Sequence, residues 1–189
     1  MKFLRLLLAG LVVLLFSGAL TPVNFASAAD TSGVSWESFK YTGTPVAQSP
    51  ASPYTPCTSG TQPVINDNWG SGSVMGCDLN YVKVHYYGYI YYPEDKTVYF
   101  RGYSDDGIKI LINNQVIVNE WGDRGCNSWS YGSFTFQANV RYPLDVWYYE
   151  KGGGTCAELA YNSSDPNGFY AVVPSSMLTR DGYVPIDVT

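Results

Sequence analysis

The chain has 189 residues, a formal net charge of −5 at pH 7, and 17 tyrosines among an aromatic content of 16%. An acidic chain without basic clusters is not expected to bind nucleic acid or an anionic membrane surface through its net field, whereas it suits a bound cation. The roughly 160 residues that follow the N-terminal segment are enough for one well-filled core and too few for two typical domains.

In residues 1–29, charged, apolar and small residues follow one another as they do in a secretory signal peptide. Lys2 and Arg5 precede an apolar run from Leu6 to Phe16, and small residues follow as far as Ala29. That run is about eleven residues long, and a membrane-spanning helix needs about 20. We therefore expect cleavage after residue 28 or 29. The expected product is a secreted protein, extracellular or at the cell surface, with no membrane insertion after cleavage.

Four cysteines follow this segment: Cys57, Cys77, Cys126 and Cys156. In an oxidising compartment an even number of cysteines predicts two disulfides, for which three pairings exist. We favour Cys57 with Cys77, which would staple a segment rich in Pro, Gly and Ser, and Cys126 with Cys156. A zinc site is the alternative, but the chain has no C-x-x-C pair and a single histidine, His85.

Three regions follow the signal in the predicted organisation. Residues 30–60 form an extended segment packed on the domain, 61–175 form the domain itself, and 176–189 form a C-terminal tail. The segment up to residue 76 is rich in Pro, Ser, Thr and Gly and reads mostly as ordered loop. It contains one early strand over 36–41 and a short one at 64–65.

Period-two alternation begins near Tyr81 and predicts strands through most of the remaining chain. The expected strands are 82–90, 98–103, 108–112, 116–118, 133–137, 144–150, 156–161 and 169–173. Gly88 is expected to form a β-bulge. Asn113-Asn114 suits a two-residue hairpin, because Asn tolerates positive φ. Many short strands without helical periodicity predict an all-β fold, an antiparallel β-sandwich or barrel.

The residues most informative about chemistry are Asp105 and Asp106, in the run Ser-Asp-Asp-Gly between two alternating strands. That position predicts a hairpin tip, where two adjacent carboxylates repel each other unless a cation lies between them. Hard Ca²⁺ takes six to eight oxygen ligands. A second loop could supply further oxygens from the Glu150 carboxylate and the carbonyls of Lys151 and Gly153. The alternative is a tight turn with glycine in the left-handed conformation.

The chain resembles the PA14 domain over roughly residues 60–175. The resemblance is carried by the strand 84–90, by the run Ser-Asp-Asp-Gly-Ile-Lys-Ile at 104–110, by 112–121, and by Trp-Tyr-Tyr-Glu with its triple glycine at 147–154. It implies a β-sandwich. In the lectin branch it also implies that Asp105 and Asp106 are joined by a cis peptide and bind Ca²⁺, which binds vicinal sugar hydroxyls. Asn113-Asn114 departs from the Asp-Gly of many members.

Sugar sites commonly add aromatic rings that stack on the apolar face of a sugar. Trp121, Trp129 and Tyr131 are expected in the loop before Ser133, where they could flank the cation. The alternative is that they pack in the core or at its rim. The remaining tryptophans are better read as core residues: Trp36, Trp69 and Trp147.

These observations predict a secreted, Ca²⁺-dependent carbohydrate-binding module for a glycan or polysaccharide, lectin-like or adhesin-like, rather than an enzyme. Adjacent carboxylates cannot easily attack a glycosidic bond from two sides. The single histidine, His85, sits within a strand, where we expect a satisfied sheet residue. The alternatives are a structural or protein-binding module without sugar binding, since fold does not imply function, and an accessory module of a polysaccharide-acting system.

Overall fold

The computed structural model describes residues 31–44 and 54–182. The predicted signal peptide and the second half of the predicted tail lie outside these residues. Within the part that is described, no helix is long and apolar enough to span a membrane.

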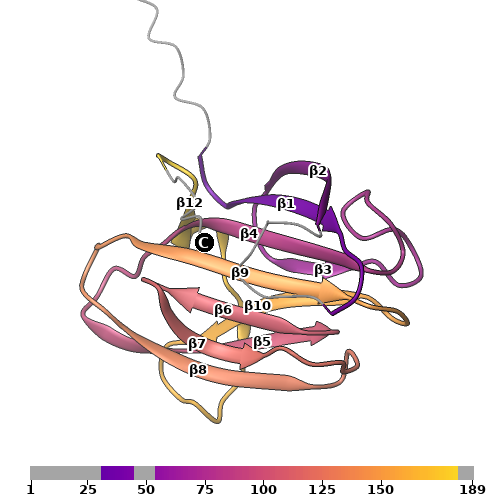
Figure 1. Ribbon diagram of the computed structural model, residues 1–189. Helices are drawn as coiled ribbons and strands as arrows, with labels where there is room; N and C mark the ends of the chain where they lie inside the picture. The colour runs from indigo at the N-terminus through magenta and orange to yellow at the C-terminus, as the bar shows by residue number, and fades with distance from the viewer. Residues whose placement is uncertain (1–30, 45–53, 183–189) are drawn as a thin grey trace, which may run out of the picture.

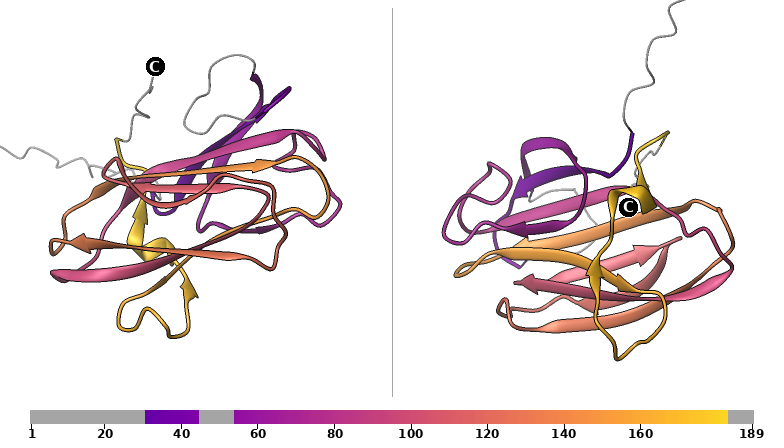
Figure 2. Two further views of the ribbon diagram at one scale, coloured as in Figure 1. Left: turned by 60° about the horizontal axis from the view of Figure 1, so that its bottom comes forward. Right: turned by 180° about the vertical axis from the view of Figure 1, so that it is seen from behind.

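Two antiparallel sheets form a sandwich, which the left view of Figure 2 shows as two layers. Sheet A follows one order from the top to the bottom of Figure 1: β2 (Thr55–Gln62), β1 (Val34–Lys40), β4 (Val82–Ile90), β9 (Tyr142–Glu150), β6 (Ile108–Ile112) and β7 (Gln115–Glu120), with β12 (Leu178–Thr179) also paired to β4. Sheet B has the order β11 (Ala171–Val172), β10 (Cys156–Asn162), β5 (Lys96–Asp105) and β8 (Trp129–Phe136), with β3 (Asn66–Asn68) paired to β10. The 3-10 turn η1 (Ser175–Met177) precedes β12. The all-β sandwich prediction is confirmed.

The core lies between the sheets and is supplied by every second residue of the central strands. In β5, Val98 and Phe100 are fully buried, while the alternate residues Tyr99 and Arg101 are partly exposed. Sheet A contributes to this core Val82, Val84, Tyr86 and Ile90 of β4, Ile108, Ile110 and Ile112 of β6, and Leu144, Val146 and Tyr148 of β9. The alternation read from the sequence therefore identifies the inward face correctly.

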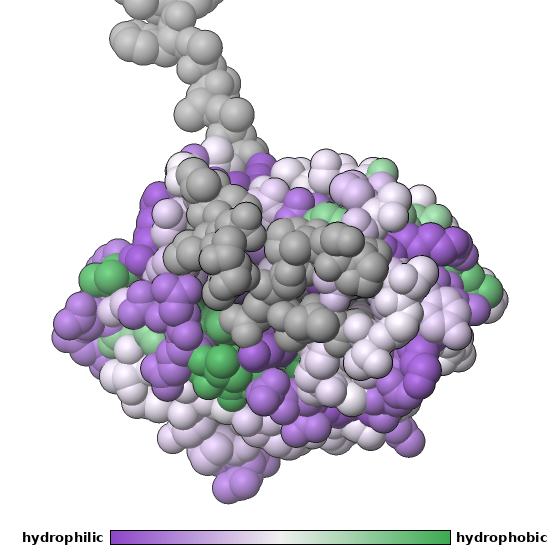
Figure 3. Space-filling view, viewed as in Figure 1, coloured by the Kyte–Doolittle hydropathy of each residue, from purple (hydrophilic) through white to green (hydrophobic). Residues whose placement is uncertain are grey.

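The outer face of sheet A carries a buried polar cluster around His85. Its Nε2 lies 2.8 Å from Asp145 Oδ1, and its Nδ1 lies 3.3 Å from Glu37 Oε1. The imidazole stacks on Trp147 with ring centroids 3.8 Å apart. His85 is thus a satisfied sheet residue, as predicted. Trp147 is buried, but on this outer face rather than between the sheets, whereas Trp36 and Trp69 pack against the core. Among the coloured residues of this side of the molecule, hydrophilic surface predominates and the hydrophobic areas are small and separate (Figure 3).

Two local predictions have opposite outcomes. Asn113 and Asn114 have φ values of 53° and 61° and join β6 to β7 as a two-residue turn, so that prediction is confirmed. The bulge at Gly88 is wrong, because β4 pairs with β9 in unbroken register. Gly88 instead lies on β4 between the residues that pair with β1, which reach Tyr87, and those that pair with β12, which start at Tyr89. A Cβ at this position would lie 2.8 Å from the carbonyl oxygen of Thr179, so the glycine allows this close approach.

Other strands differ from prediction mainly at the edges of the sheets. Strand β2 lies in the segment expected to be loop, and β8 begins four residues before the expected Ser133. The short strand expected at 64–65 forms instead as β3, which begins two residues later, and the strand expected at 169–173 is reduced to β11.

Both favoured disulfides are present. Cys57 of β2 is bonded to Cys77, and Cys126 is bonded to Cys156, with Cα atoms 5.3 Å and 6.2 Å apart. The second bond ties the connection between β7 and β8 to the first residue of β10. It therefore fixes one end of the sandwich.

Candidate functional site

Asp105 and Asp106 lie where the chain crosses from one sheet to the other. β5 pairs with β8 and β10 in sheet B, whereas the following strand, β6, pairs with β7 and β9 in sheet A. The predicted hairpin tip is therefore wrong, because two successive alternating strands need not pair with each other. The peptide bond between Asp105 and Asp106 is cis, as the resemblance implied.

Gly107 is not the left-handed glycine of a tight turn, since its φ is not positive. A Cβ at this position would lie 2.2 Å from Cε1 of Tyr149. The two backbones are also hydrogen bonded here, from Asp106 N to Tyr149 O (3.1 Å) and from Tyr149 N to Gly107 O (2.9 Å). The glycine therefore lets the crossover pack directly against β9, which brings the aspartates to the end of that strand.

Glu150 is the last residue of β9 and meets the aspartates from the other sheet. It continues the inward alternation of Val146 and Tyr148 and has no exposed surface. One carboxylate oxygen from each of Asp105, Asp106 and Glu150 lies within 4.8 Å of the others. Three predicted metal ligands thus converge at one point between the ends of the two sheets.

Backbone amides and one hydroxyl hold these carboxylates in place. Asp106 Oδ1 accepts a hydrogen bond from the Arg124 N–H (3.0 Å), and its Oδ2 accepts one from the Lys151 N–H (2.8 Å). The Tyr148 hydroxyl lies 2.6 Å from the Asp105 carbonyl oxygen and 3.2 Å from Glu150 Oε2. The carboxylates of Asp106 and Glu150 therefore have a defined orientation before any ligand binds.

The electrostatics of the cluster favour a cation. Burial, reinforced by the charge of Asp106, raises the pKa of Glu150 to about 8, and burial together with Asp106 also raises the pKa of Asp105. Glu150 Oε1 is buried and has no hydrogen-bond partner among the described residues. Buried polar oxygens are rarely left unpaired. A hard cation such as Ca²⁺, which binds carboxylate and carbonyl oxygens, fits both this oxygen and the crowded negative charge.

The glycine-rich loop after β9 lies against the cluster, as the sequence predicts. A Cβ on Gly154 would lie 3.1 Å from Asp105 Oδ2, and Lys151 contacts Asp106 through its amide. Gly153, with φ of +116°, belongs to the same loop. The participation of the Lys151 and Gly153 carbonyls as ligands stays a prediction.

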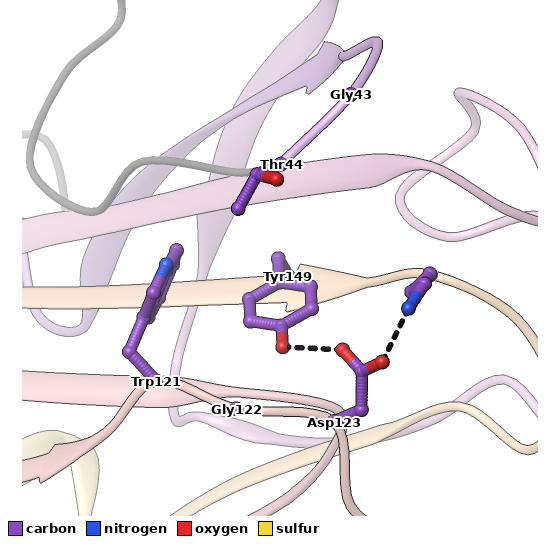
Figure 4. Close-up of a pocket in the computed structure, with 7 residues that line it drawn as sticks. Gly43, Thr44, Trp121, Gly122, Asp123 and Tyr149 are labelled. Carbon is purple, nitrogen blue, oxygen red and sulfur yellow. Dashed lines mark hydrogen bonds and ion pairs between the residues drawn. The ribbon is translucent and has the colours of Figure 1, made fainter.

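Trp121 lies beside this cluster, in a hollow on the other side of β9. Its ring contacts Tyr149 edge-on with centroids 4.8 Å apart, and both rings line the hollow with Asp123 and Lys151 (Figure 4). The Tyr149 hydroxyl donates to Asp123 Oδ1 (2.8 Å), and Lys151 Nζ pairs with Asp123 Oδ2. Aromatic surface and polar groups are therefore side by side next to the predicted metal ligands.

Trp129 and Tyr131 do not lie in a loop, and that expectation is wrong. Both belong to β8, where they alternate with the inward residues Phe134 and Phe136 and point away from the core. They are 52% and 56% exposed. They form part of the outer face of sheet B, and their role in ligand binding stays a prediction.

Sequence reasoning missed two residues that shape the cluster. Tyr148 carries a readable signal, because residues two apart in a strand share a face and Tyr148 therefore accompanies Glu150. Arg124 carries none, because it acts through its backbone N–H, which any residue except proline provides.

Comparison with known proteins supports the resemblance noted in the sequence. A comparison with curated proteins finds no match. One similar solved structure is an anti-sigma factor domain-containing protein, with 19% identity and a TM-score of 0.68, in a match that covers 82% of this chain and 50% of that one. A second is the PA14 sugar-binding domain of an RTX adhesin, with 18% identity and a TM-score of 0.59, covering 79% of this chain and 99% of that one. A third is the epithelial adhesin 6 A domain of Candida glabrata in complex with Galβ1-3GlcNAc, with 14% identity and a TM-score of 0.58, covering 79% of this chain and 87% of that one.

At these identities the similar structures show the fold alone. The chain spans half the length of the anti-sigma factor protein. The PA14 domain model matches residues 30–172, which is most of the sequence. The match includes both strands that supply the acidic cluster. The chain therefore belongs to the PA14 domain family.

Proposed function

We propose that this protein is a secreted, Ca²⁺-dependent glycan-binding module. The observation that carries the proposal is the convergence of Asp105, Asp106 and Glu150, with one Glu150 oxygen buried and lacking a partner among the described residues. Three carboxylates in one buried cluster are unfavourable without a compensating cation. Similar structures named as a sugar-binding domain and as an adhesin in complex with a disaccharide support the choice of ligand class.

Asp105, Asp106 and Glu150 would hold the ion, with carbonyl oxygens of Lys151 and Gly153 as further ligands. The bound ion would neutralise the carboxylates and present coordination positions that vicinal sugar hydroxyls can fill. Trp121 and Tyr149 would offer their aromatic surface to the sugar, and Asp123 would offer hydrogen bonds. Binding, rather than catalysis, is the activity that we assign to this arrangement.

Secretion is part of the proposal. It rests on the charged, apolar and small-residue order of residues 1–29 and on the two disulfides, which are typical of oxidising compartments. Extracellular calcium would then be available to the cluster.

Calcium titration by isothermal calorimetry and a glycan array, each with and without EGTA, test the proposal. The wild-type protein should bind Ca²⁺ and should bind glycans only when Ca²⁺ is present. Asp106→Asn should lose both activities, because it removes one charge from the cluster and weakens a ligand. Glu94→Gln is the matched control, since Glu94 is exposed and lies just before the start of β5, at the end of the strand opposite Asp105.

The outcomes separate the alternatives. Calcium binding with no glycan bound on the array would favour a structural or protein-binding module. Glycan binding that persists in EGTA and in Asp106→Asn would show that the cluster is not the sugar site.

A further inference from the structure

The outer face of sheet B carries a row of aromatic side chains away from the acidic cluster. Tyr103 of β5 pairs with Trp129 of β8, and Arg101 pairs with Tyr131, so these four side chains occupy adjacent positions on one face. The ring centroids of Tyr103 and Trp129 are 6.2 Å apart. The right view of Figure 2 looks at the molecule from the side on which β10, β5 and β8 lie nearest the viewer.

Two of these rings are exposed although they sit on a regular strand, and Tyr103 is partly exposed. Trp129 and Tyr131 each expose more than half of their surface. Tyr131 also borders a hollow formed with the loop that contains Pro166, Asn167 and Gly168. Exposed clusters of large aromatic residues mark interaction sites, because isolated ones are ordinary but a contiguous group is costly to leave in water.

Polar groups fixed by hydrogen bonds and ion pairs separate the rings. The Arg101 guanidinium lies 4.9 Å from the Trp129 ring centroid and 5.5 Å from that of Tyr170. Its Nη2 pairs with Glu158 Oε1 at 2.7 Å. A sugar chain presents this same alternation of apolar C–H faces and hydroxyl groups.

The charge of the face selects the kind of polysaccharide. Arg101 is neutralised by Glu158, and the whole chain is acidic, with a net charge of −5. An anionic polymer would find no compensating positive field here, and would be repelled by the chain as a whole. An uncharged chain meets neither obstacle.

The face also continues toward the acidic cluster. A surface hollow is lined by Asp123, Arg124 and Trp129, and the Arg124 amide is one of the two that hold Asp106. Along β8, the two-residue step from Trp129 to Tyr131 advances by about 7 Å, which is on the scale of one pyranose unit. An extended ligand can therefore lie along Trp129 and Tyr131 without contacting the carboxylates.

We propose that the outer face of sheet B, formed by Tyr103, Trp129, Tyr131 and the Arg101–Glu158 pair, binds an uncharged linear polysaccharide independently of any metal ion. The side chains are fixed on strands, so little ordering is needed when the ligand binds. This site is distinct from the proposed calcium site and extends the function beyond it.

Affinity electrophoresis in native gels tests the proposal. The gels contain mixed-linkage β-glucan, xylan or galactomannan, and each is run with calcium and with excess EGTA. At least one polysaccharide should retard the wild-type protein equally in both conditions. The double variant Trp129→Ala/Tyr131→Ala should bind that polysaccharide about tenfold more weakly or worse. Val116→Ala, which removes an exposed apolar side chain from β7, should bind as the wild type does.

Further arms keep the two proposals separable. Asp106→Asn should leave the EGTA-resistant retardation unchanged, so a failed calcium site would not hide this one. The proposal is overturned if no polysaccharide retards the protein in EGTA, or if the double variant, shown by circular dichroism to be folded, is retarded as strongly as the wild type. It is also overturned if light scattering shows a dimer that the double variant disrupts, since a second copy would then cover the face.

Discussion

The raised pKa of Glu150 makes a specific prediction about the stability of the metal-free protein. Glu150 stays protonated in the fold up to about pH 8, whereas in the unfolded chain it ionises near its ordinary value. Between these two values the folded state binds the extra proton, so the free energy of unfolding must fall as the pH rises. The protein in EGTA should therefore lose stability from pH 5 to pH 8.

The magnitude follows from proton linkage. One group that is protonated only in the folded state contributes a slope of about 1.4 kcal/mol per pH unit. For a chain of this size, 1 kcal/mol corresponds to about 2–4 °C in Tm, so the expected decline is roughly 3–6 °C per pH unit. The raised pKa of Asp105 acts in the same direction.

Calorimetric melting of the wild type and of Glu150→Gln, each in EGTA and in Ca²⁺, measures this effect. Glutamine keeps the size of the side chain and an acceptor for the Tyr148 hydroxyl, but it does not ionise. Glu150→Gln should therefore show a flatter decline in EGTA and exceed the wild type at pH 8. In Ca²⁺ the wild type should be the more stable, because the ion binds the ionised cluster.

Titrating groups away from the cluster contribute equally to both proteins, so the difference between them isolates Glu150 and its coupling to Asp105 and Asp106. Glu94→Gln, which neutralises an exposed carboxylate, should keep the wild-type slope. If the wild type and Glu150→Gln decline in parallel in EGTA, the buried cluster does not govern the pH dependence and the electrostatic reasoning is refuted.

Three further substitutions probe the support of the site. Gly107→Ala would place a methyl group 2.2 Å from Tyr149 and should cost about 1–3 kcal/mol in urea unfolding, whereas wild-type stability would disprove the tight packing. Replacing Cys126 and Cys156 by serine removes a disulfide between residues 30 apart in the sequence, which should lower the free energy of unfolding by about 3 kcal/mol and weaken Ca²⁺ binding. An unchanged Ca²⁺ affinity in calorimetry would show that the disulfide does not support the cluster. Ile110→Ala, in the fully buried core, should cost about 2–5 kcal/mol without changing Ca²⁺ affinity, and a parallel loss of affinity would show that core and cluster are coupled.

The strands of the core could be predicted because their inward faces repeat every second residue. The alternation in 82–90 and 144–150 is visible in the sequence and agrees with β4 and β9. Strand β2 could not be found in this way. It is an edge strand with most of its residues exposed, so burial imposes no apolar pattern on Thr, Pro, Ser and Gly.

The acidic residues of the site could be predicted, but their setting could not. Adjacent aspartates and a glutamate before a glycine-rich loop are unusual enough to indicate a cation. Alternation along β5 and β6, however, does not reveal which sheet each strand joins, so the pattern predicts a hairpin where the chain crosses between the sheets. Trp129 could not be placed for the same reason. Its side chain is exposed because β8 joins sheet B with that side chain on the outer face, and the neighbouring residues in the sequence do not reveal this pairing.

The proposed calcium site would link calcium binding to folding, because the acidic cluster lies between the two sheets. Asp105 ends a strand of sheet B and Glu150 ends a strand of sheet A, so an ion held by both would tie the two sheets together where Cys126–Cys156 already fixes the end of the sandwich. The disulfide is permanent in an oxidising compartment, whereas the ion is present only where calcium is available. The site between the sheets is therefore expected to exist in its binding form only outside the cell. The aromatic face of sheet B has its rings fixed by strand pairing and its one cation already neutralised by Glu158, so the same physical reasoning predicts that it keeps its affinity when calcium is removed.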